Sequence, residues 1–292
     1  MVLVIGAAGT IGREVIKLLS ARAVETRALI HRRKIDLPRD VSACYGDLLN
    51  PESLPAAFQN VNRLFLATPS DPLQIAKENN AVKAALKYGC QHIVKISTLR
   101  SKGETRSLLA SWHDSIEHTL MDSGISYTIL RCHNFMQNLL KARVDIVGRG
   151  VLPAPLGTSK IALLDARDVA EVSVNALLED DHQNRIYRLT GPKALSYREI
   201  AEILSAILKI SIKYEDLTEE TAKERLLAEG VPEWQVTELI NLYGQFKAGH
   251  GTKVWPDLGE LLGREATSFQ QFAADYADQF FDLENAEGGE FL

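Results

Sequence analysis

The sequence predicts an α/β protein of the Rossmann type, with a doubly wound parallel sheet and a smaller, mainly helical C-terminal lobe. Short apolar runs rich in β-branched residues alternate with segments of helical periodicity, and a glycine-rich turn follows the first run directly. After Gly191-Pro192 the alternation ends and the helical pattern dominates. Strands that alternate with helices form a parallel sheet covered on both faces.

Each element is predicted from its own pattern. Apolar runs bounded by turn residues indicate strands. The first helical segment, 10–22, places Ile11, Val15 and Leu19 on one stripe, as a helix that packs on a sheet requires. A glycine ends each of the next two helices. The predicted strands are 2–5, 26–30, 63–67, 92–97 and 127–130, and the next two predicted helices are 76–88 and 108–123.

The chain divides into a dinucleotide-binding domain and a smaller lobe on the substrate side. The segment 148–159 is rich in glycine and proline and is predicted to be a loop. Ser196 and Glu199 have the spacing of a capping box, which starts the first helix of the lobe. After the loop we expect a short strand at 160–164, a helix at 168–178 and a strand of the sheet at 186–189. The predicted units are 1–147 with 160–190 for the domain, 148–159 with 191–285 for the lobe, and 286–292 for a flexible tail.

The composition is that of a soluble globular protein and argues against several other classes. Of the 292 residues 46% are hydrophobic and 24% charged, and the net charge of -5 makes nucleic acid an unexpected partner. The three cysteines show no CxxC spacing, which disfavours a disulfide framework and a zinc site and suits a reducing cytoplasm. We expect neither a secretion signal nor a membrane span, because no apolar run has the required length or flanks.

Three glycines spaced GxxGxxG connect the first predicted strand to the first predicted helix. In dinucleotide-binding folds the first glycine lets the chain turn, the second lets backbone N–H groups approach the pyrophosphate, and the third lets the helix pack on the strand. The helix dipole also favours an anion there. A ligand-free turn is the alternative, but such a turn needs only one glycine. We therefore predict that the pyrophosphate is bound by Gly6, Ala8, Gly9, Thr10, Ile11 and Gly12.

The end of the second predicted strand bears on the choice between NADP and NAD. An acidic residue at this position would bind the ribose 2′-hydroxyl of NAD. The sequence instead has His31, Arg32 and Arg33, followed by Lys34, and the nearest acid is Asp36. Cationic side chains suit a 2′-phosphate. The pattern favours NADP as the cofactor, with NAD as the second choice, and a solvated basic loop is the alternative interpretation.

Short motifs follow the predicted strands in a consistent order. They are Gly46-Asp47-Leu48, Leu66-Ala67-Thr68-Pro69, Ile96-Ser97-Thr98, Trp112-His113, Tyr127-Thr128-Ile129-Leu130-Arg131, Phe135-Met136-Gln137-Asn138, Asp165-Ala166-Arg167-Asp168-Val169-Ala170 and Leu189-Thr190-Gly191-Pro192. With the glycine loop, they make the chain resemble the NmrA-like family of atypical short-chain dehydrogenase/reductases over nearly its whole length. This family includes NAD(P)H-dependent quinone, azo and dye reductases as well as redox-sensor proteins.

The resemblance implies further contacts with the coenzyme. Asp47 and Leu48 are expected beside the adenine, and the loop after Leu130 is expected to close over the nicotinamide. The resemblance assigns the path of the ribose and pyrophosphate to Ala67, Thr68 and Pro69, and it adds Ser97 to the cofactor-binding residues. Without it, Asp47 is an ordinary turn residue and Thr68-Pro69 an ordinary end of a strand.

One helix departs from the pattern of carbonyl-reducing short-chain dehydrogenases. Those enzymes place a tyrosine four residues before a lysine, so that the cation lowers the pKa of the phenol. The chain has Leu109 and His113 instead, which excludes a Tyr–Lys pair at this site and disfavours a sugar-nucleotide epimerase.

His113 is the candidate catalytic residue. Glu117 follows it by four residues, so its carboxylate could orient the ring and raise the pKa of His113. The histidine would bind the nicotinamide ribose or donate a proton. A surface His–Glu pair of little energetic weight is the alternative. We predict no metal site, because no third ligand has suitable spacing.

The substrate is expected to meet the residues that follow the strand at 127–130. His133, Asn134, Phe135 and Met136 combine aromatic, apolar and hydrogen-bonding groups, which suits a flat and partly apolar acceptor. Core packing is the alternative for Phe135 and Met136.

These features predict an NAD(P)H-dependent oxidoreductase that transfers hydride to a small conjugated acceptor, such as a quinone, azo or dye-like compound, without a Tyr–Lys pair. The alternative is a non-catalytic redox sensor that binds NAD(P) and acts through a protein partner. A plant-type reductase of phenylpropanoid ethers is less favoured, since that branch keeps a lysine where this chain has His113. We expect a cytoplasmic monomer or homodimer that works on a small molecule, without nucleic acid or membrane.

Overall fold

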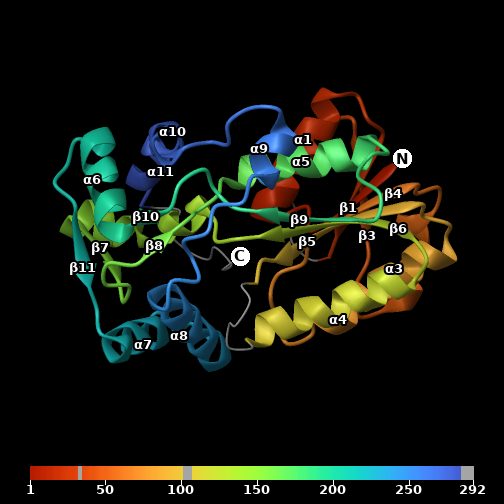
Figure 1. The fold of residues 1–292 in the computed structure, drawn as a ribbon. Helices are drawn as coiled ribbons and strands as arrows, with labels where there is room; N and C mark the ends of the chain where they lie inside the picture. The colour runs from red at the N-terminus through yellow and green to blue at the C-terminus, as the bar shows by residue number, and fades with distance from the viewer. Residues whose placement is uncertain (32–34, 101–106, 284–292) are drawn as a thin grey trace.

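The computed structural model describes residues 1–31, 35–100 and 107–283, and a parallel sheet of seven strands runs through its centre (Figure 1). The strand order is β3-β2-β1-β4-β5-β6-β9, and every pairing within this sheet is parallel. The predicted doubly wound sheet is confirmed. Its strands are β1 (Val2–Ile5), β2 (Thr26–Ile30), β3 (Val41–Tyr45), β4 (Arg63–Leu66), β5 (His92–Thr98), β6 (Ser126–Cys132) and β9 (Arg185–Leu189).

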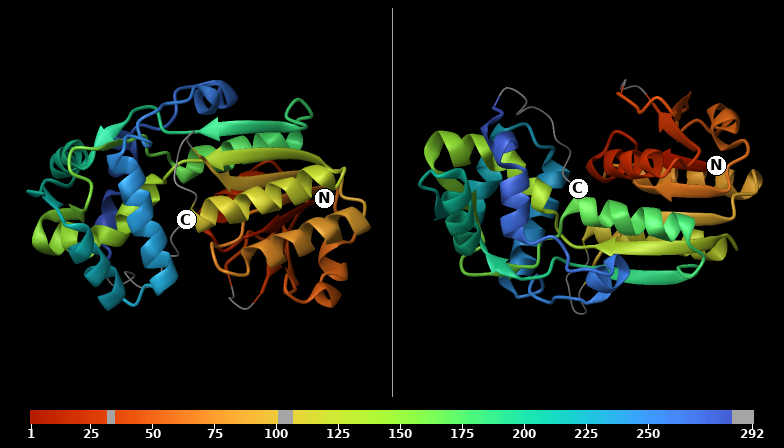
Figure 2. Two further views of the ribbon diagram at one scale, coloured as in Figure 1. Left: turned by 60° about the horizontal axis from the view of Figure 1, so that its bottom comes forward. Right: turned by 90° about the horizontal axis from the view of Figure 1, so that it is seen from above.

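Helices cover both faces of this sheet. In β1, Val2 and Val4 face one cluster of buried side chains, and Leu3 and Ile5 face another, as the two-residue period of a strand requires. On the first face α1 (Thr10–Ala21) and α5 (Ala166–Leu178) lie side by side, with α9 (Asp257–Leu262) next to them (Figures 1 and 2). The opposite face carries α2 (Pro55–Phe58), α3 (Gln74–Lys87) and α4 (Leu108–Asp122).

The strand β3 is the one element of the sheet that apolar composition alone does not predict. It lies at the edge of the sheet, and between Val41 and Tyr45 only Val41 is fully buried. An edge strand with such exposure has no need of the apolar run that marks a central strand. The return of the chain to the sheet after α5 is confirmed, because β9 pairs with β6.

A smaller lobe lies beyond the carboxyl ends of the strands and has its own apolar core (Figure 1). It contains two pairs of short strands, one parallel and one antiparallel. The parallel pair is β7 (Val151–Ala154) with β11 (Lys213–Asp216), and the antiparallel pair is β8 (Lys160–Ile161) with β10 (Leu195–Ser196). The helices are α6 (Tyr197–Leu208), α7 (Glu219–Ala228), α8 (Glu233–Lys247), α10 (Phe269–Asp275) and α11 (Ala277–Phe281).

Two details of this lobe differ from the prediction. The segment 148–159 is not a loop throughout, because β7 lies within it and pairs with β11 from far along the chain. By pattern alone, a proline argues against a central strand. Pro153 lies in β7, which in the described part of the chain pairs only with β11 and is therefore an edge strand, where a proline is tolerated. The predicted strand at 160–164 shortens to Lys160–Ile161. A 3-10 helix (Met136–Ala142) and a π-helix (Val144–Arg149) precede β7, and a further 3-10 turn (Pro51–Ser53) precedes α2.

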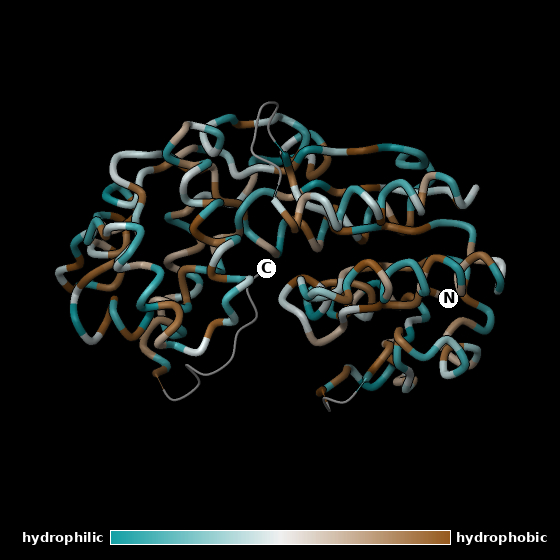
Figure 3. Tube along the Cα trace, turned by 90° about the horizontal axis from the view of Figure 1, so that it is seen from below, coloured by the Kyte–Doolittle hydropathy of each residue, from teal (hydrophilic) through white to brown (hydrophobic). Residues whose placement is uncertain are grey.

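Hydrophobic and hydrophilic residues alternate along the outer helices (Figure 3). None of the helices in residues 1–31, 35–100 and 107–283 is long and apolar enough to cross a membrane. The predicted tail, 286–292, lies outside the described residues, and the exact division between domain and lobe stays a prediction.

The capping box at the start of α6 gives a test of the lobe's stability. The Ser196 hydroxyl accepts a hydrogen bond from the Glu199 backbone, and the Glu199 carboxylate accepts one from the Ser196 backbone. We expect Ser196→Ala to lower the free energy of unfolding by about 1 kcal/mol, because it leaves an N–H group of the first turn without its partner. Urea denaturation measures this change, with Glu202→Ala on the exposed face of α6 as control. Equal stabilities of the two variants would contradict the prediction.

Candidate active site

The glycine loop lies at the point where the strand order reverses between β1 and β4. Gly6 has a positive φ of 90°, and a Cβ at this position would overlap the carbonyl oxygen of Ala67 at the end of β4. A Cβ on Gly12 would overlap the carbonyl oxygen of Gly6. Ligands of open α/β sheets bind beyond the carboxyl ends of the strands at such a reversal. The loop and the end of β4 therefore form one tightly packed cradle.

The N-terminus of α1 is open to an anion. Its N-cap is Gly9, no side chain caps it, and its first turn carries no acidic residue. By contrast, Ser107 caps α4 and Asp165 caps α5. The uncapped N–H groups and the positive end of the helix dipole suit a pyrophosphate. The Ile11 side chain is buried in the core, so this residue can offer only its backbone.

The structure brings His31 and Asp47 together beside this cradle. His31 Nε2 lies 3.3 Å from Asp47 Oδ2, and both side chains are partly exposed. Asp47 also accepts a hydrogen bond from the backbone of Leu49 at 2.8 Å, as an ordinary turn residue does. Arg32 and Arg33 lie outside the described residues, so their contact with a 2′-phosphate stays a prediction.

The other residues expected along the coenzyme differ in exposure. Leu48 is buried, and its carbonyl accepts a hydrogen bond from the Asn80 side chain at 2.8 Å. Pro69 is exposed, whereas Ser97, near the carboxyl end of β5, is buried. Leu48 and Ser97 therefore lie under the surface of the predicted site.

A buried ion pair lies directly behind Thr68. The Thr68 hydroxyl donates a hydrogen bond of 2.7 Å to Glu78 Oε1, and Gln74 Nε2 donates one of 3.2 Å to the same oxygen. Glu78 Oε2 lies 2.6 Å from Nζ of Lys95. Both charged side chains are fully buried, Glu78 on α3 and Lys95 on β5.

His113 contacts this ion pair rather than Glu117. Its Nδ1 lies 3.3 Å from Lys95 Nζ. Burial, together with the positive charges of Lys95 and Arg100, holds the pKa of His113 well below its ordinary value. The prediction that Glu117 raises the pKa of His113 is wrong.

Glu117 is bound by two neighbouring strands instead. It accepts hydrogen bonds of 3.2 and 2.5 Å from Arg131 and one of 2.5 Å from the Ser97 hydroxyl. Ser97 and Arg131 are in register on β5 and β6, so their side chains lie on the same face and meet the carboxylate together. The hydrogen bonds with Glu117 raise the pKa of Arg131.

The smaller lobe holds the N-terminus of α4, the helix that carries His113. Glu238 of α8 accepts hydrogen bonds from the backbone N–H groups of Leu108, at 2.8 Å, and Leu109, at 3.4 Å. The rings of Trp112 and Trp234 lie 5.5 Å apart between the same two helices. A carboxylate at this end also suits the helix dipole. The position of α4 therefore depends on the lobe.

The predicted substrate residues are mostly packed inside the protein. Phe135 and Met136 are 5% and 1% exposed, and they belong to two different apolar cores. The carbonyl of Asn134 accepts a hydrogen bond from the backbone of Leu164. Burial lowers the pKa of His133 to about 4, and its ring lies 5.5 Å from that of Phe246. Contact of these residues with an acceptor stays a prediction.

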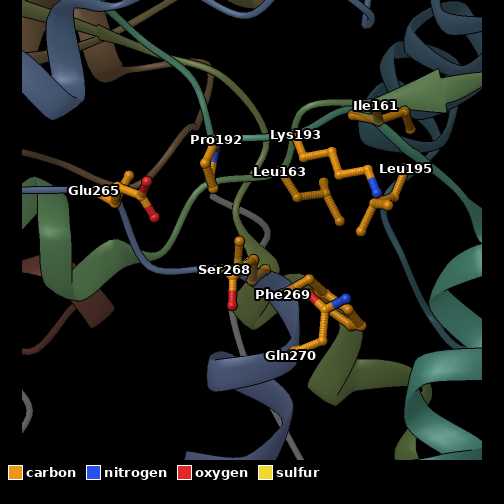
Figure 4. Close-up of a pocket in the computed structure, with 11 residues that line it drawn as sticks. Ile161, Leu163, Pro192, Lys193, Leu195, Glu265, Ser268, Phe269 and Gln270 are labelled. Carbon is orange, nitrogen blue, oxygen red and sulfur yellow. The ribbon is translucent and has the colours of Figure 1, made fainter.

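A separate pocket of about 150 Å³ lies in the smaller lobe (Figure 4). It is lined by residues from β8, β10 and α10 and by the loops next to them, and Met136 is the one predicted site residue in its wall. Pro192, Lys193, Glu265 and Phe269 are among the others. This pocket therefore does not join the glycine loop to His113.

Sequence reasoning missed Lys95, Glu78 and Glu238. Lys95 had a visible signal, since a charge inside an apolar strand that is buried on both faces needs a partner. Glu78 had one too: it lies within the predicted helix 76–88, on the buried stripe of α3 with Gln74 and Ala81, and a buried carboxylate also needs a partner. Glu238 had none, because its partners are backbone groups more than 120 residues away.

No group of histidine, cysteine or acidic side chains in the described ranges could hold a metal ion. Cys44, Cys90 and Cys132 are free thiols.

A glycine loop at the reversal point of a parallel sheet, followed by an uncapped helix, defines a dinucleotide-binding protein. The model of the NmrA-like family matches residues 1–277, and the chain belongs to this family. The resemblance seen in the sequence is confirmed.

The relatives cover almost the whole chain. It is 33% identical over 284 residues to an NAD(P)H azoreductase of Xenophilus azovorans, covering 96% of this chain and 99% of the relative. It is 33% identical over 286 residues to a (4-alkanoyl-5-oxo-2,5-dihydrofuran-3-yl)methyl phosphate reductase of Streptomyces griseus, with the same coverage. An NADPH-dependent quinone oxidoreductase of Escherichia coli, solved with NADPH, superposes with a TM-score of 0.83 at 24% identity, covering 97% of this chain and all of the other.

The cradle around Gly12 predicts the effect of one added methyl group. We expect Gly12→Ala to weaken NADPH binding about tenfold to hundredfold, because the displaced loop loses one or two hydrogen bonds to a charged group. Titration calorimetry measures the affinity, and circular dichroism checks the fold. Gly244→Ala in α8 is the matched control, since a Cβ there would meet open space. Unchanged affinity of the Gly12 variant would show that the loop does not hold the pyrophosphate.

Proposed function

We propose that the protein is an NADPH-dependent reductase that passes hydride to a small conjugated acceptor, such as a quinone or an azo compound. The observation that carries the proposal is the cradle of Gly6, Gly12 and Ala67 beneath the uncapped end of α1. Relatives that are 33% identical over nearly the full length are reductases, among them an azoreductase, and this supports the same reaction class.

In this proposal each part of the site has a separate task. Backbone N–H groups of the loop and of α1 hold the pyrophosphate, and the coenzyme supplies a hydride when it is bound. Thr68 and His113 lie at the two ends of the buried Glu78–Lys95 pair and belong to the same site. Arg32 and Arg33 would bind the 2′-phosphate.

The proposed class of acceptor follows from the absence of a catalytic tyrosine on α4. Leu109 stands where a tyrosine would donate a proton, and its backbone N–H is bound by Glu238. Because the pKa of His113 is lowered, this residue is neutral at pH 7. A conjugated acceptor needs little help from a strong acid when it accepts hydride, and its proton can come from water.

We also propose that the protein works in a reducing compartment, the cytoplasm, as a monomer or homodimer. The three free thiols support a reducing compartment.

A panel of acceptors tests the proposed reaction. We expect NADPH oxidation, followed at its near-ultraviolet absorbance, with at least one quinone or azo dye, and none with an isolated ketone, because reduction of an isolated ketone needs a positioned proton donor. Gly12→Ala is the control that ties turnover to the coenzyme site. Tight NADPH binding without turnover on any acceptor would overturn the proposal and favour the redox sensor instead.

The basic residues after β2 give a test of coenzyme choice. We expect the double variant Arg32→Ala/Arg33→Ala to raise the KM for NADPH about tenfold or more, since each charged hydrogen bond is worth about 1.5–3 kcal/mol. The KM for NADH should remain the same, because NADH lacks the 2′-phosphate. Parallel steady-state assays with the two coenzymes measure the ratio, and an equal effect on both would remove these arginines from the phosphate site.

A further inference from the structure

Lys95 is a fully buried charged residue in the middle of β5, an interior strand of the sheet. Its ammonium lies 2.6 Å from Glu78 Oε2, 2.6 Å from the carbonyl oxygen of Ile96 and 3.3 Å from His113 Nδ1. An ammonium has three N–H donors and no acceptor. The contact with Glu78 Oε2 is an ion pair rather than a hydrogen bond. Because the ammonium cannot accept, the contact with His113 is one in which the ring nitrogen accepts.

This arrangement determines which nitrogen of His113 carries the proton. A neutral imidazole has one N–H group and one acceptor nitrogen. Since Nδ1 accepts from Lys95, the proton of the ring is on Nε2. We propose that Lys95 is a positioning residue, which holds His113 uncharged in its Nε2–H tautomer and connects it through Glu78 to Thr68 in the coenzyme site.

The charges around His113 act in the same direction. Lys95 approaches from β5, and Arg100, which pairs with Asp114, comes from the segment after β5. The acidic residue one turn along α4, Glu117, is bound by Arg131 and Ser97.

From the other elements, Glu78 of α3 is paired with Lys95, and Glu238 of α8 binds the backbone at the start of α4. Within the described ranges no carboxylate forms an ion pair with His113, while a buried ammonium touches it. A second positive charge on the ring is therefore unfavourable, in agreement with its lowered pKa.

This inference rests on the proposed function and gives His113 a specific role in it. The ring presents one N–H donor on the side away from Lys95, and it cannot act as an imidazolium acid near neutral pH. A group fixed in this way can hold a carbonyl or hydroxyl oxygen in place while hydride is transferred. Its usefulness depends on its orientation, which the Lys95–Glu78 pair maintains.

Nuclear magnetic resonance of the coenzyme-free protein tests the tautomer directly. In protein labelled with ¹⁵N-histidine, we expect His113 to show the Nε2–H pattern with no titration between about pH 5.5 and pH 8. His113→Asn assigns the signal, and His133, whose pKa is about 4, serves as an internal reference. Protonation of His113 in this range, or a proton on Nδ1, would overturn the proposal. The result depends on neither coenzyme nor turnover, so it stands apart from the proposed function.

A double variant tests the role of Lys95. Lys95→Met alone would leave Glu78 buried without its partner, so Lys95→Met is combined with Glu78→Gln, which removes both charges. We expect the pKa of His113 to rise and both tautomers to appear, while the signal of His133 does not change. A His113 ring that keeps one tautomer in this variant would show that Lys95 does not fix it.

The pH dependence of turnover then distinguishes a positioning role of Lys95 from a purely structural one. With NADPH and a reducible quinone, we expect the pH profile of kcat/KM of the native protein to show no ionisation of His113 between about pH 5.5 and pH 8. In the double variant kcat/KM should rise as pH decreases through the new pKa of His113, because the imidazolium always carries the Nε2–H donor, whereas the neutral ring divides between two tautomers. A uniform loss of activity at every pH, parallel to a loss of stability, would assign a purely structural role to Lys95.

Discussion

The site depends on the absence of a side chain at Gly6, where the glycine loop meets the carbonyl of Ala67. This contact joins the ends of β1 and β4, two strands that are neighbours in the sheet but are separated in the chain by α1, β2, β3 and α2. Because the loop has no space to move towards β4, the N–H groups of α1 have a fixed direction. The positions of Thr68 and the residues behind it follow from the same strand end.

Burying Lys95 and Glu78 has a substantial cost. Two charges lose their hydration, and well-packed apolar residues in their place often give a protein that is equally stable. Thr68 and Gln74 donate to Oε1 of the carboxylate, the ion pair with Lys95 holds Oε2, and the ammonium donates to His113 and to the carbonyl of Ile96. Such networks hold their members in one arrangement. Stability alone does not require this pair, whereas orientation of Thr68 and His113 does.

Much of the fold could be predicted from the sequence, because central strands and sheet-packed helices have strong periodic patterns. Edge strand β3 and the β7–β11 pair were missed, since both depend on partners rather than on composition. At the site, the spacing of His113 and Glu117 shows only that they could touch. Their actual partners, Lys95 and Arg131, come from β5 and β6, and a spacing within one helix carries no information about such competitors.

The hydrogen bond from Thr68 to Glu78 has a consequence for molecular recognition. A hydroxyl has a single hydrogen, and the hydrogen of Thr68 is directed at a buried carboxylate. Towards a coenzyme bound as proposed, this oxygen would offer only lone pairs. It can accept a hydrogen bond from a ribose hydroxyl, whereas an oxygen of the pyrophosphate would be repelled. In the proposed site Thr68 would therefore distinguish sugar from phosphate along the dinucleotide and so help to set the register of the coenzyme.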